Sequence, residues 1–529
     1  MRKGAIDTMR NQGIGSWTAR RARKSPHALA VVHQDRQLTY LELHERALRL
    51  AGRLRAAGLG RGEAVAYLGP NHPSYLETLF ATGILGAVFV PLNTRLAAAE
   101  VGYCLGDSGA RVLIHTAGFA KLAEAASGES EDLTLIPVDE EYESALASGP
   151  AEPIDEPVAQ TEPCMIMYTS GTTGRPKGAV LSHGNLTWNS VNVVVDTDFL
   201  HDEVTLVSAP LFHTAALNMT CLPTLLKGGT VILEEAFDEA RTLELIATRG
   251  VTTLFGVPTM YQRLADAPGF DETELGGIRN LLCGGAPVPE PLIRRYLERG
   301  LSFVQGYGMT EASPGTLLLD SEHALSKAGT AGVPHFFTDV RLARPDGTAA
   351  EVDEPGEVQV EGPNVMLEYW GRPVETRRAL AEGWLHSGDL AVADEDGYVR
   401  IVDRIKDLII SGGENISPAQ VESVLYQHEA VSECSVIGVA DERWGEVGRA
   451  VVVPRAPYAA GDALAAELLA YAADRLARYK VPKSVVFTDS LPRTGAGKVL
   501  KSALRERHGQ RSAGQGTDEQ RTDRQEQAE

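Results

Sequence analysis

Cysteine is scarce in this chain of 529 residues, and its few cysteines form no pattern. The five are scattered and never form a Cys-x-x-Cys pair; they are Cys104, Cys164, Cys221, Cys283 and Cys434. An odd number of isolated cysteines argues against a disulfide framework or a zinc site, and it is typical of a reduced protein. We therefore expect a cytoplasmic protein.

Long apolar runs are also missing. No stretch of 18 or more apolar residues occurs, so we expect no membrane-spanning helix. The basic residues near the start, such as Arg2, Lys3 and Arg10, are not followed by an apolar segment. We therefore expect no signal peptide.

Positively charged residues are also fewer than negatively charged ones. Lys and Arg number 50 against 71 Asp and Glu, which gives a net charge of −21. Non-specific binding of nucleic acid needs a cationic field, so this class of partner is excluded. A few local Lys, Arg and backbone N–H groups can still bind a polyphosphate in an acidic protein.

The chain does contain a regular alternation of helix and strand signals, over a length too great for one core. Thr39 and Glu42 form a capping box at the start of a helical pattern that ends near Gly58. A strand is predicted at 64–68, a helix at 75–85 and a strand at 88–92. This βαβ rhythm predicts a parallel sheet with both faces covered.

Later segments complete the predicted fold. Buried strands are expected at 164–168, 205–208, 252–256 and 280–283, and short alternating runs between about 335 and 402 predict a small antiparallel barrel or meander. A boundary falls near 402–407, after which Ser417, Pro418 and Gln420 mark a helix start. We expect an α/β protein: a large N-terminal domain of stacked α/β subdomains with a β-barrel-like subdomain, and a small α+β C-terminal domain.

Two glycine-rich loops carry the strongest chemical signal. Residues 168–178 read YTSGTTGRPKG, and residues 492–498 read PRTGAGK. Glycines let backbone N–H groups surround an anion, hydroxyls add donors, and Lys177 and Lys498 each add an ammonium. The first loop is not a Walker A loop, because Lys177 lies between a proline and a glycine. Two phosphate-binding loops so far apart suggest an enzyme that activates a substrate with ATP and then moves a domain.

Further motifs follow in a fixed order. They are PLFH at 210–213, GGAP at 284–287, GYGMTE at 306–311, GWLHSGD at 383–389, DRIKD at 403–407 and SGGENISP at 411–418. With the two loops, they resemble the signature of the adenylate-forming superfamily of acyl- and aryl-CoA synthetases, luciferases and peptide-synthetase adenylation domains. The resemblance covers about residues 15–507, and the overall sequence pattern is most similar to that of fatty-acyl- and aryl-CoA ligases.

The resemblance implies a site for ATP and Mg²⁺. The phosphates would be held by Thr169, Ser170, Gly171, Thr172, Thr173, Gly174 and Lys177. The adenine would lie against Gly285, Ala286, Pro287 and Tyr307, and the ribose would be bound by Asp389 and Arg404. The Thr310 hydroxyl would bind the α-phosphate and Glu311 the metal, because Mg²⁺ takes few protein ligands and shares phosphate oxygens.

The resemblance also implies a moving C-terminal domain. The expected parts are an N-terminal domain over 1–403, a hinge at 404–407 that contains Lys406, a mobile domain over 408–507 and a disordered tail over 508–529, which is too polar to order itself. Lys498 would bridge the substrate carboxylate and the α-phosphate. After rotation, Gly412 and Gly413 would approach the CoA tunnel, where His213 is expected as a gate to the acyl pocket.

The expected reaction is the ATP-dependent activation of a fatty or aryl carboxylic acid to an acyl-adenylate, followed by transfer to CoA. Two alternatives remain at this stage: an adenylating enzyme with another acceptor, such as a carrier protein, an amine or a diazo-forming, nitrite-activating partner, and a non-catalytic binding module. The pocket candidates are mainly apolar, and they are His213, Thr214, Leu217, Asn218, Phe255 and Gly256. A homodimer is left open.

Overall fold

The computed structural model describes residues 10–128, 132–148, 151–169, 176–286, 288–411, 414–441, 443–493 and 499–509, without the side chains of Lys406 and Asn415. The chain forms two compact units, Met1–Ile401 and Val402–Glu529, and each is described by itself. Several predicted site residues lie outside the described residues: Ser170, Gly171, Thr172, Thr173, Gly174, Pro287, Gly412, Gly413 and Lys498. The expected tail also lies outside them from residue 510 onward.

The first unit contains a sheet whose central strands are parallel, ordered β18–β8–β7–β4–β3–β5–β6. Its strands are β3 (Ala64–Leu68), β4 (Val88–Pro91), β5 (Ala110–Thr116), β6 (Thr134–Val138), β7 (Pro163–Thr169), β8 (Lys177–Ser182) and β18 (Glu368–Tyr369). The helices among them are α1 (Gly15–Lys24), α2 (Tyr40–Ala56), α3 (Pro73–Leu85), α4 (Ala98–Ser108), α5 (Ala120–Ser127), α6 (Glu140–Ala147) and α7 (His183–Asp196). The predicted capping box of Thr39 and Glu42 is confirmed at the start of α2.

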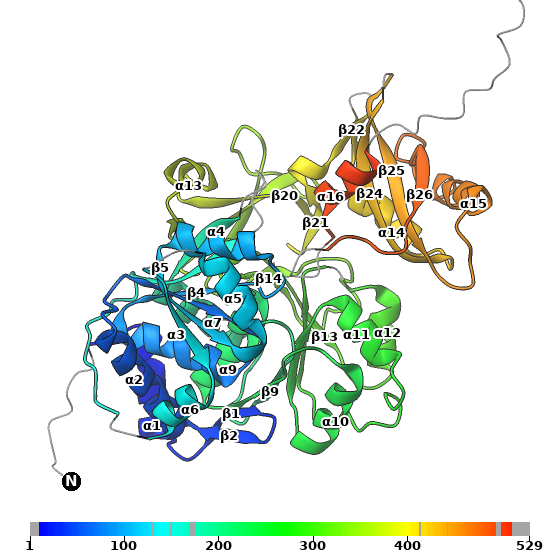
Figure 1. Cartoon of the computed structure of the whole chain (residues 1–529). Helices are drawn as coiled ribbons and strands as arrows, with labels where there is room; N and C mark the ends of the chain where they lie inside the picture. Colours follow the sequence, from blue (N-terminus) through cyan, green and yellow to red (C-terminus); the bar gives the residue numbers. More distant parts are fainter. Residues whose placement is uncertain are drawn as a thin grey trace, which may run out of the picture. The chain divides into compact units, whose positions relative to one another are not determined.

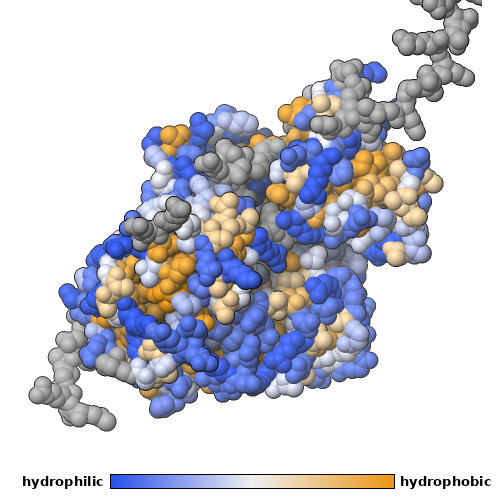
Figure 2. Space-filling view, viewed as in Figure 1, coloured by the Kyte–Doolittle hydropathy of each residue, from blue (hydrophilic) through white to orange (hydrophobic). Residues whose placement is uncertain are grey.

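A second sheet of the same unit has the order β15–β14–β13–β12–β11–β9–β10–β1–β2, parallel from β13 to β1. Its strands are β1 (Leu29–His33), β2 (Arg36–Thr39), β9 (Val204–Val207), β10 (Thr230–Leu233), β11 (Thr253–Gly256), β12 (Asn280–Gly284), β13 (Phe303–Gly308), β14 (Gly315–Leu319) and β15 (Val333–Pro334). Its helices are α8 (Thr214–Ala216), α9 (Leu222–Lys227), α10 (Glu239–Arg249), α11 (Pro258–Ala265) and α12 (Glu290–Leu297). Hydrophilic side chains predominate on the visible surface around α10 (Figure 2), as its amphipathic sequence requires.

Helix α3 joins the two sheets. Every residue of α3 is buried, which is the environment that a helix without a polar face requires. The ring of Tyr75 packs edge-on against Phe89 of β4, and its hydroxyl donates to the carbonyl of Leu211 in the loop after β9, at 2.8 Å. In Figure 1, α3 lies between α2 and β4, both of which it contacts. One hydrophobic cluster therefore includes side chains from both sheets, among them Phe89 of β4 and Val207 of β9.

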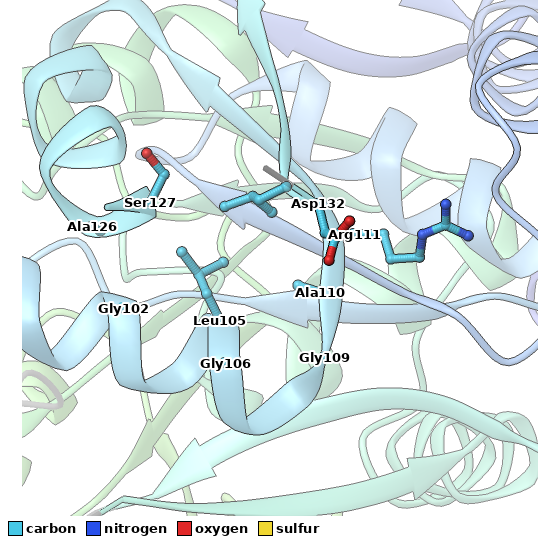
Figure 3. Close-up of a pocket in the computed structure, with 10 residues that line it drawn as sticks. Gly102, Leu105, Gly106, Gly109, Ala110, Arg111, Ala126, Ser127 and Asp132 are labelled. Atoms are coloured by element: carbon cyan, nitrogen blue, oxygen red, sulfur yellow. The ribbon is translucent and has the colours of Figure 1, made fainter. Parts of the chain in front are cut away.

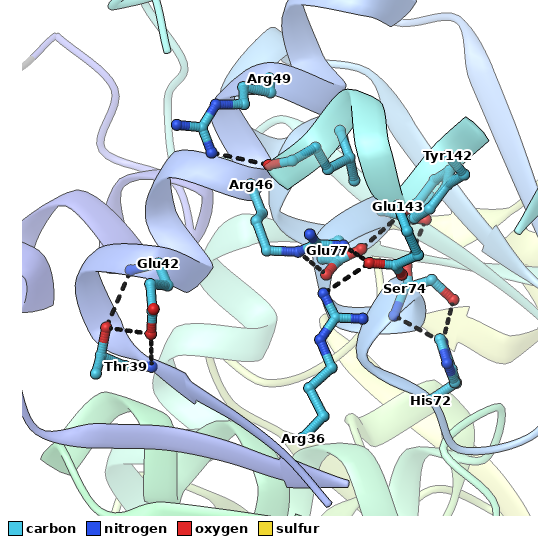
Figure 4. Close-up of polar contacts among 12 residues, drawn as sticks. Arg36, Thr39, Glu42, Arg46, Arg49, His72, Ser74, Glu77, Tyr142 and Glu143 are labelled. Carbon is cyan, nitrogen blue, oxygen red and sulfur yellow. Dashed lines mark hydrogen bonds and ion pairs between the residues drawn. The ribbon is translucent and has the colours of Figure 1, made fainter. Parts of the chain in front are cut away.

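A buried ion pair holds α3 against α2 and α6 (Figure 4). Arg46 Nε lies 2.6 Å from Glu77 Oε1, with side-chain exposures of 5% and 0%. Tyr142 Oη donates to the other oxygen of Glu77 at 2.7 Å, and Arg46 also reaches Glu143 at 3.0 Å. The charges are thus paired and hydrogen-bonded, as burial of a charge requires.

The predicted antiparallel region follows. Its strands are β16 (Asp339–Ala343), β17 (Gly356–Glu361), β19 (Leu380–Ala381), β20 (Trp384–Ala393) and β21 (Val399–Arg404), with α13 at Pro373–Ala379. The pairs β16–β17, β17–β20 and β19–β20 are antiparallel, which confirms the predicted meander. Within the described part of the chain, no helix combines the length and apolar character needed to cross a membrane.

The second unit is a small α+β structure. Its sheet contains β22 (Ile409–Ser411), β23 (Glu414–Ile416), β24 (Val431–Asp441), β25 (Gly445–Pro454) and β26 (Ser484–Phe487), and its helices are α14 (Pro418–Leu425), α15 (Asp462–Ala473) and α16 (Lys501–His508). The Ser417 hydroxyl accepts from the Gln420 N–H at the start of α14, as predicted. His508, expected to begin the tail, is instead the last residue of α16.

Candidate active site

The predicted adenine segments lie at the carboxyl ends of adjacent parallel strands. Gly285 and Ala286 follow β12 and are exposed, and Tyr307 is the penultimate residue of β13. Gly285 has a φ of +86°, which favours glycine. Ligands of open α/β sheets bind at this edge, so the sequence placed these residues where a nucleotide is expected.

Tyr307 and the predicted ribose-binding Asp389 are in direct contact. The Tyr307 hydroxyl donates to Asp389 Oδ2 at 2.6 Å, and Asp389, on β20, is only 7% exposed. This contact holds one oxygen of the buried carboxylate in place, and carboxylate oxygens are acceptors, as the binding of ribose hydroxyls would require. The structure therefore brings these two predicted residues together across 82 positions of sequence.

Thr310 and Glu311 begin a short 3-10 turn, Thr310–Ala312, one residue after the end of β13. The Tyr369 hydroxyl donates to Glu311 Oε1 at 2.7 Å. Lys177, the first residue of β8, places its ammonium 5.3 Å from the centre of the Tyr369 ring. The structure thus brings the Glu311 carboxylate and the Lys177 ammonium, from two of the motifs, to one tyrosine that belongs to none of them.

Buried amides hold the backbone of this turn. Asn364 Nδ2 donates to the carbonyls of Ala312 and Gly315, at 2.8 and 2.7 Å. Asn218 Nδ2 donates to the Ser313 carbonyl at 3.0 Å, and Asn189 Oδ1 accepts from the Gly315 N–H at 2.9 Å. The three asparagines have no exposed surface. A turn tied at so many backbone groups keeps Thr310 and Glu311 in fixed positions.

The strands that flank the first glycine loop are anchored by α4. Tyr168, at the end of β7, donates its hydroxyl to Asp107 Oδ2 at 2.9 Å, and burial together with this carboxylate raises the pKa of Tyr168. Trp370 Nε1 donates to the Asp107 carbonyl at 3.0 Å. Thr169, the last residue of β7, pairs with Lys177 of β8. The described ends of the loop are therefore rigidly held.

His213 lies half-buried at the start of α8, and its ring packs against Phe212 with centroids 4.7 Å apart. The chain continues as a π-helix over Leu217–Cys221, an irregularity that often marks functional sites. Leu217 and Asn218 are fully buried there. Phe255 and Gly256 end β11 of the same unit.

The remaining described candidates belong to the second unit. Arg404 ends β21, its side chain is exposed, and its backbone N–H donates to Asp403 Oδ1 at 2.8 Å. Lys406 lies in the 3-10 turn Ile405–Asp407. Asp407 pairs with Arg505 of α16 at 2.8 Å.

Sequence reasoning missed Tyr369, Asn364 and Asn189. Tyr369 and Asn364 lie in the string GPNVMLEYWG at 362–371, whose one polar amide and one tyrosine give no signal of their own. A cavity of about 520 Å³ between α4 and α5 is lined by none of the predicted residues (Figure 3). Its lining includes Gly102, Gly106 and Ser127.

Two matches to known protein families identify the family to which this chain and its candidate site belong. Residues 18–370 match the AMP-binding enzyme family, and residues 420–498 match the AMP-binding enzyme C-terminal domain. The chain belongs to the AMP-binding enzyme family. The adenylate-forming resemblance expected from the motifs is thereby confirmed.

Individual relatives of this AMP-binding enzyme indicate which reaction it catalyses. The chain is 59% identical over 503 residues to a feruloyl-CoA synthase of an Amycolatopsis species, covering 95% of this chain and 100% of that protein. It is 40% identical to an indoleacetate–CoA ligase of Aromatoleum aromaticum, covering 93% and 98%. The o-succinylbenzoate coenzyme A synthetase of Bacillus subtilis, solved with ATP and a magnesium ion, superposes with a TM-score of 0.84 at 33% identity, covering 93% and 99%.

These relatives establish the reaction. The AMP-binding enzyme described here is an acid–thiol ligase that uses Mg²⁺ and ATP to form an acyl-adenylate and then transfers the acyl group to CoA. The alternatives of another acceptor and of a non-catalytic module give way to this result. The Glu311 carboxylate and the Thr310 hydroxyl, adjacent in the sequence, fit a nucleotide-bound Mg²⁺, because this ion takes few ligands from the protein.

Proposed function

We propose that the acid activated by this enzyme is a hydroxycinnamic acid of the ferulic type, a propenoic acid on a ring with a hydroxyl and a methoxy group. The observation that carries the proposal is the 59% identity to a feruloyl-CoA synthase along its entire length. Leu217 and Phe255, the two large apolar side chains among the pocket candidates, suit an aromatic ring, because apolar and aromatic side chains predominate in sites of this kind.

Asn218 supports the phenolic part of the proposal. Its amide nitrogen is used by the Ser313 carbonyl, whereas its buried Oδ1 has no hydrogen-bond partner among the described residues. A buried acceptor without a partner costs free energy, and the hydroxyl of a phenol can satisfy it. We therefore propose that Asn218 accepts a hydrogen bond from the ring hydroxyl of the substrate.

The residues of the first unit divide the work of adenylation in this proposal. The substrate carboxylate attacks the α-phosphorus of ATP, which forms the acyl–phosphate bond and releases pyrophosphate. Thr310 binds the α-phosphate, the 169–177 loop with Lys177 holds the leaving phosphates, and Asp389 holds the ribose. Glu311 would hold Mg²⁺, which supplies positive charge to the phosphates. Donors already in place stabilise the charge that develops in the transition state.

The second unit serves both half-reactions in this proposal. Lys498 bridges the carboxylate and the α-phosphate during adenylation. Rotation about the hinge at Lys406 withdraws Lys498 and brings Gly412 and Gly413 to the tunnel, where the CoA thiolate attacks the adenylate and AMP leaves. Two closed states of one site keep water from the adenylate. Arg404 would contact the ribose beside Asp389, and His213 would gate the acyl pocket.

Location and assembly are further parts of the proposal. We place the enzyme in the cytoplasm, where its five free and buried cysteines stay reduced. Sedimentation of the purified enzyme would decide whether it is a homodimer.

A panel of acids tests the proposed substrate. The value of kcat/KM for CoA-dependent AMP formation would be measured with ferulate, 3-methoxycinnamate, benzoate and a long-chain fatty acid. We expect ferulate to rank first. A fatty acid that exceeds ferulate in kcat/KM would contradict the proposal.

A further inference from the structure

Tyr369 contacts both charged groups of the phosphate and metal region. Its hydroxyl donates to Glu311 Oε1 at 2.7 Å, and the Lys177 ammonium lies over its ring, 5.3 Å from the centroid. A carboxylate is acceptor-only, and the face of a phenol ring attracts a cation. One side chain therefore holds the anion through its edge and the cation through its face.

The position of this tyrosine is set by the strand that carries it. β18 pairs with β8, so that Tyr369 lies opposite Ala179, two residues after Lys177. The next residue, Trp370, is fixed twice: its backbone N–H donates to the Gly178 carbonyl at 2.7 Å, and its indole N–H donates to the Asp107 carbonyl at 3.0 Å. These bonds fix the backbone at and beside Tyr369, from which its ring projects.

The same segment also holds the backbone of the turn that carries Glu311. The Met366 N–H donates to the Glu311 carbonyl at 2.8 Å, and Asn364 donates to the carbonyls of Ala312 and Gly315. Residues 364–369 thus contact the turn through main chain and side chain alike. Glu311 is restrained at its backbone by Met366 and at its carboxylate by Tyr369.

We propose that Tyr369 is a positioning residue for the Mg²⁺–triphosphate complex. Its hydroxyl occupies one oxygen of Glu311 and leaves the other to the metal, and its ring keeps the Lys177 ammonium beside the phosphates. The proposal rests on the proposed metal role of Glu311. Groups that orient a metal ligand typically change metal affinity or activity about 10–100-fold when removed.

Calorimetric binding of α,β-methylene-ATP, with Mg²⁺ and with EDTA, tests this without turnover and without any acid. The readout is the ratio of the two dissociation constants, which reports how far Mg²⁺ tightens nucleotide binding. Y369F removes only the hydroxyl, and we expect the ratio to fall about 10-fold or more. Y369L also removes the ring, so it should in addition weaken binding in EDTA, because Lys177 loses its support.

The matched control is Y458F, which removes a tyrosine hydroxyl that donates to Glu429 in the second unit. We expect it to keep the wild-type ratio. The same ratio in folded Y369F as in wild type and Y458F would overturn the proposal. A wild-type enzyme that fails to bind the analogue at all would refute the nucleotide site, and with it the role of Tyr369. Neither outcome bears on the choice of ferulate, which the acid panel decides.

Discussion

Replacement of the side-chain amide of Asn218 tests the proposed recognition of the substrate's ring hydroxyl. Asn218→Leu removes the buried Oδ1, so we expect the preference for ferulate over 3-methoxycinnamate, expressed as a ratio of kcat/KM values, to fall about 10-fold, the worth of one hydrogen bond. The two acids differ only in the ring hydroxyl. Asn192→Leu is the control, because both ends of that buried amide are bonded, to Thr338 and to the Phe337 N–H. An unchanged ratio in Asn218→Leu would remove it from hydroxyl recognition.

His183, the first residue of α7, makes stability depend on pH. It has no exposed surface, its Nδ1 accepts from the Ile14 N–H at 3.3 Å, and burial lowers its pKa from 6.5 to about 4, partly offset by Glu162. The unfolded chain binds this proton below about pH 6.5 and the folded chain only near pH 4. The contribution of His183 to the free energy of unfolding is therefore fully present above pH 7. It is lost as the pH falls from 6.5 toward 4, by about 2 kcal/mol between pH 7 and pH 5.

Urea denaturation of the wild type and of His183→Gln at both pH values measures this contribution. The variant should lose stability between pH 7 and pH 5 by about 2 kcal/mol less than the wild type, whatever its stability at pH 7. Equal losses in the two proteins would show that His183 does not remain neutral in the folded state.

Single residues could be predicted only where a motif names them. Tyr307, Glu311 and Asp389 were identified by their strings, and the structure shows contacts of Tyr307 with Asp389 and of Glu311 with Tyr369. Tyr369 and Asn364 could not be identified, because a lone tyrosine or asparagine is more often a packing or capping residue. Their partners lie about 50 residues away in the sequence.

At the scale of elements, local signals were sufficient where a cap or a hydrophobic run marks the element. The strand predicted at 64–68 is β3 over those same residues, and the cap at Ser417 starts α14, because capping and hydrophobic runs act within a few residues. The two-residue strand β18 and the π-helix over Leu217–Cys221 gave no such signal. They depend on pairing and packing with distant parts of the chain.

The buried ion pair between α2 and α3 should affect the free energy of unfolding strongly when only one of its charges is removed. Glu77→Leu leaves Arg46 buried without its main partner, and we expect a loss of about 3–5 kcal/mol in the free energy of unfolding. The double variant Arg46→Met, Glu77→Leu removes both charges and should recover most of that loss. Denaturant titration of both variants measures the two values, and a double variant no more stable than Glu77→Leu would contradict this account.

At the scale of the whole molecule, the sequence predicted a domain boundary near 402–407, and the compact units of the structure divide between Ile401 and Val402. The order of strands in the two large sheets was beyond prediction, because β1 and β2 pair beside β10 across some 200 residues. Long-range pairing of this kind leaves no periodic trace in the sequence. The hinge at 404–407 stays a prediction.

A proline at the hinge tests the proposed rotation. Lys406→Pro fixes φ near −65° in the turn Ile405–Asp407, so we expect adenylation to survive and thioester formation to fall. ATP–pyrophosphate exchange measures the first half-reaction, and CoA consumption from supplied acyl-adenylate measures the second. Equal effects on both half-reactions would place the hinge elsewhere.

The central claim is that this enzyme joins a hydroxycinnamic acid to CoA through an adenylate. The most direct measurement follows AMP, pyrophosphate and CoA thioester in one reaction with ATP, Mg²⁺ and ferulate, with and without CoA. We predict pyrophosphate exchange without CoA, and on its addition, faster AMP release with one feruloyl thioester formed for each AMP. Ferulate-dependent pyrophosphate exchange that CoA neither accelerates to AMP release nor converts to a thioester would contradict the account.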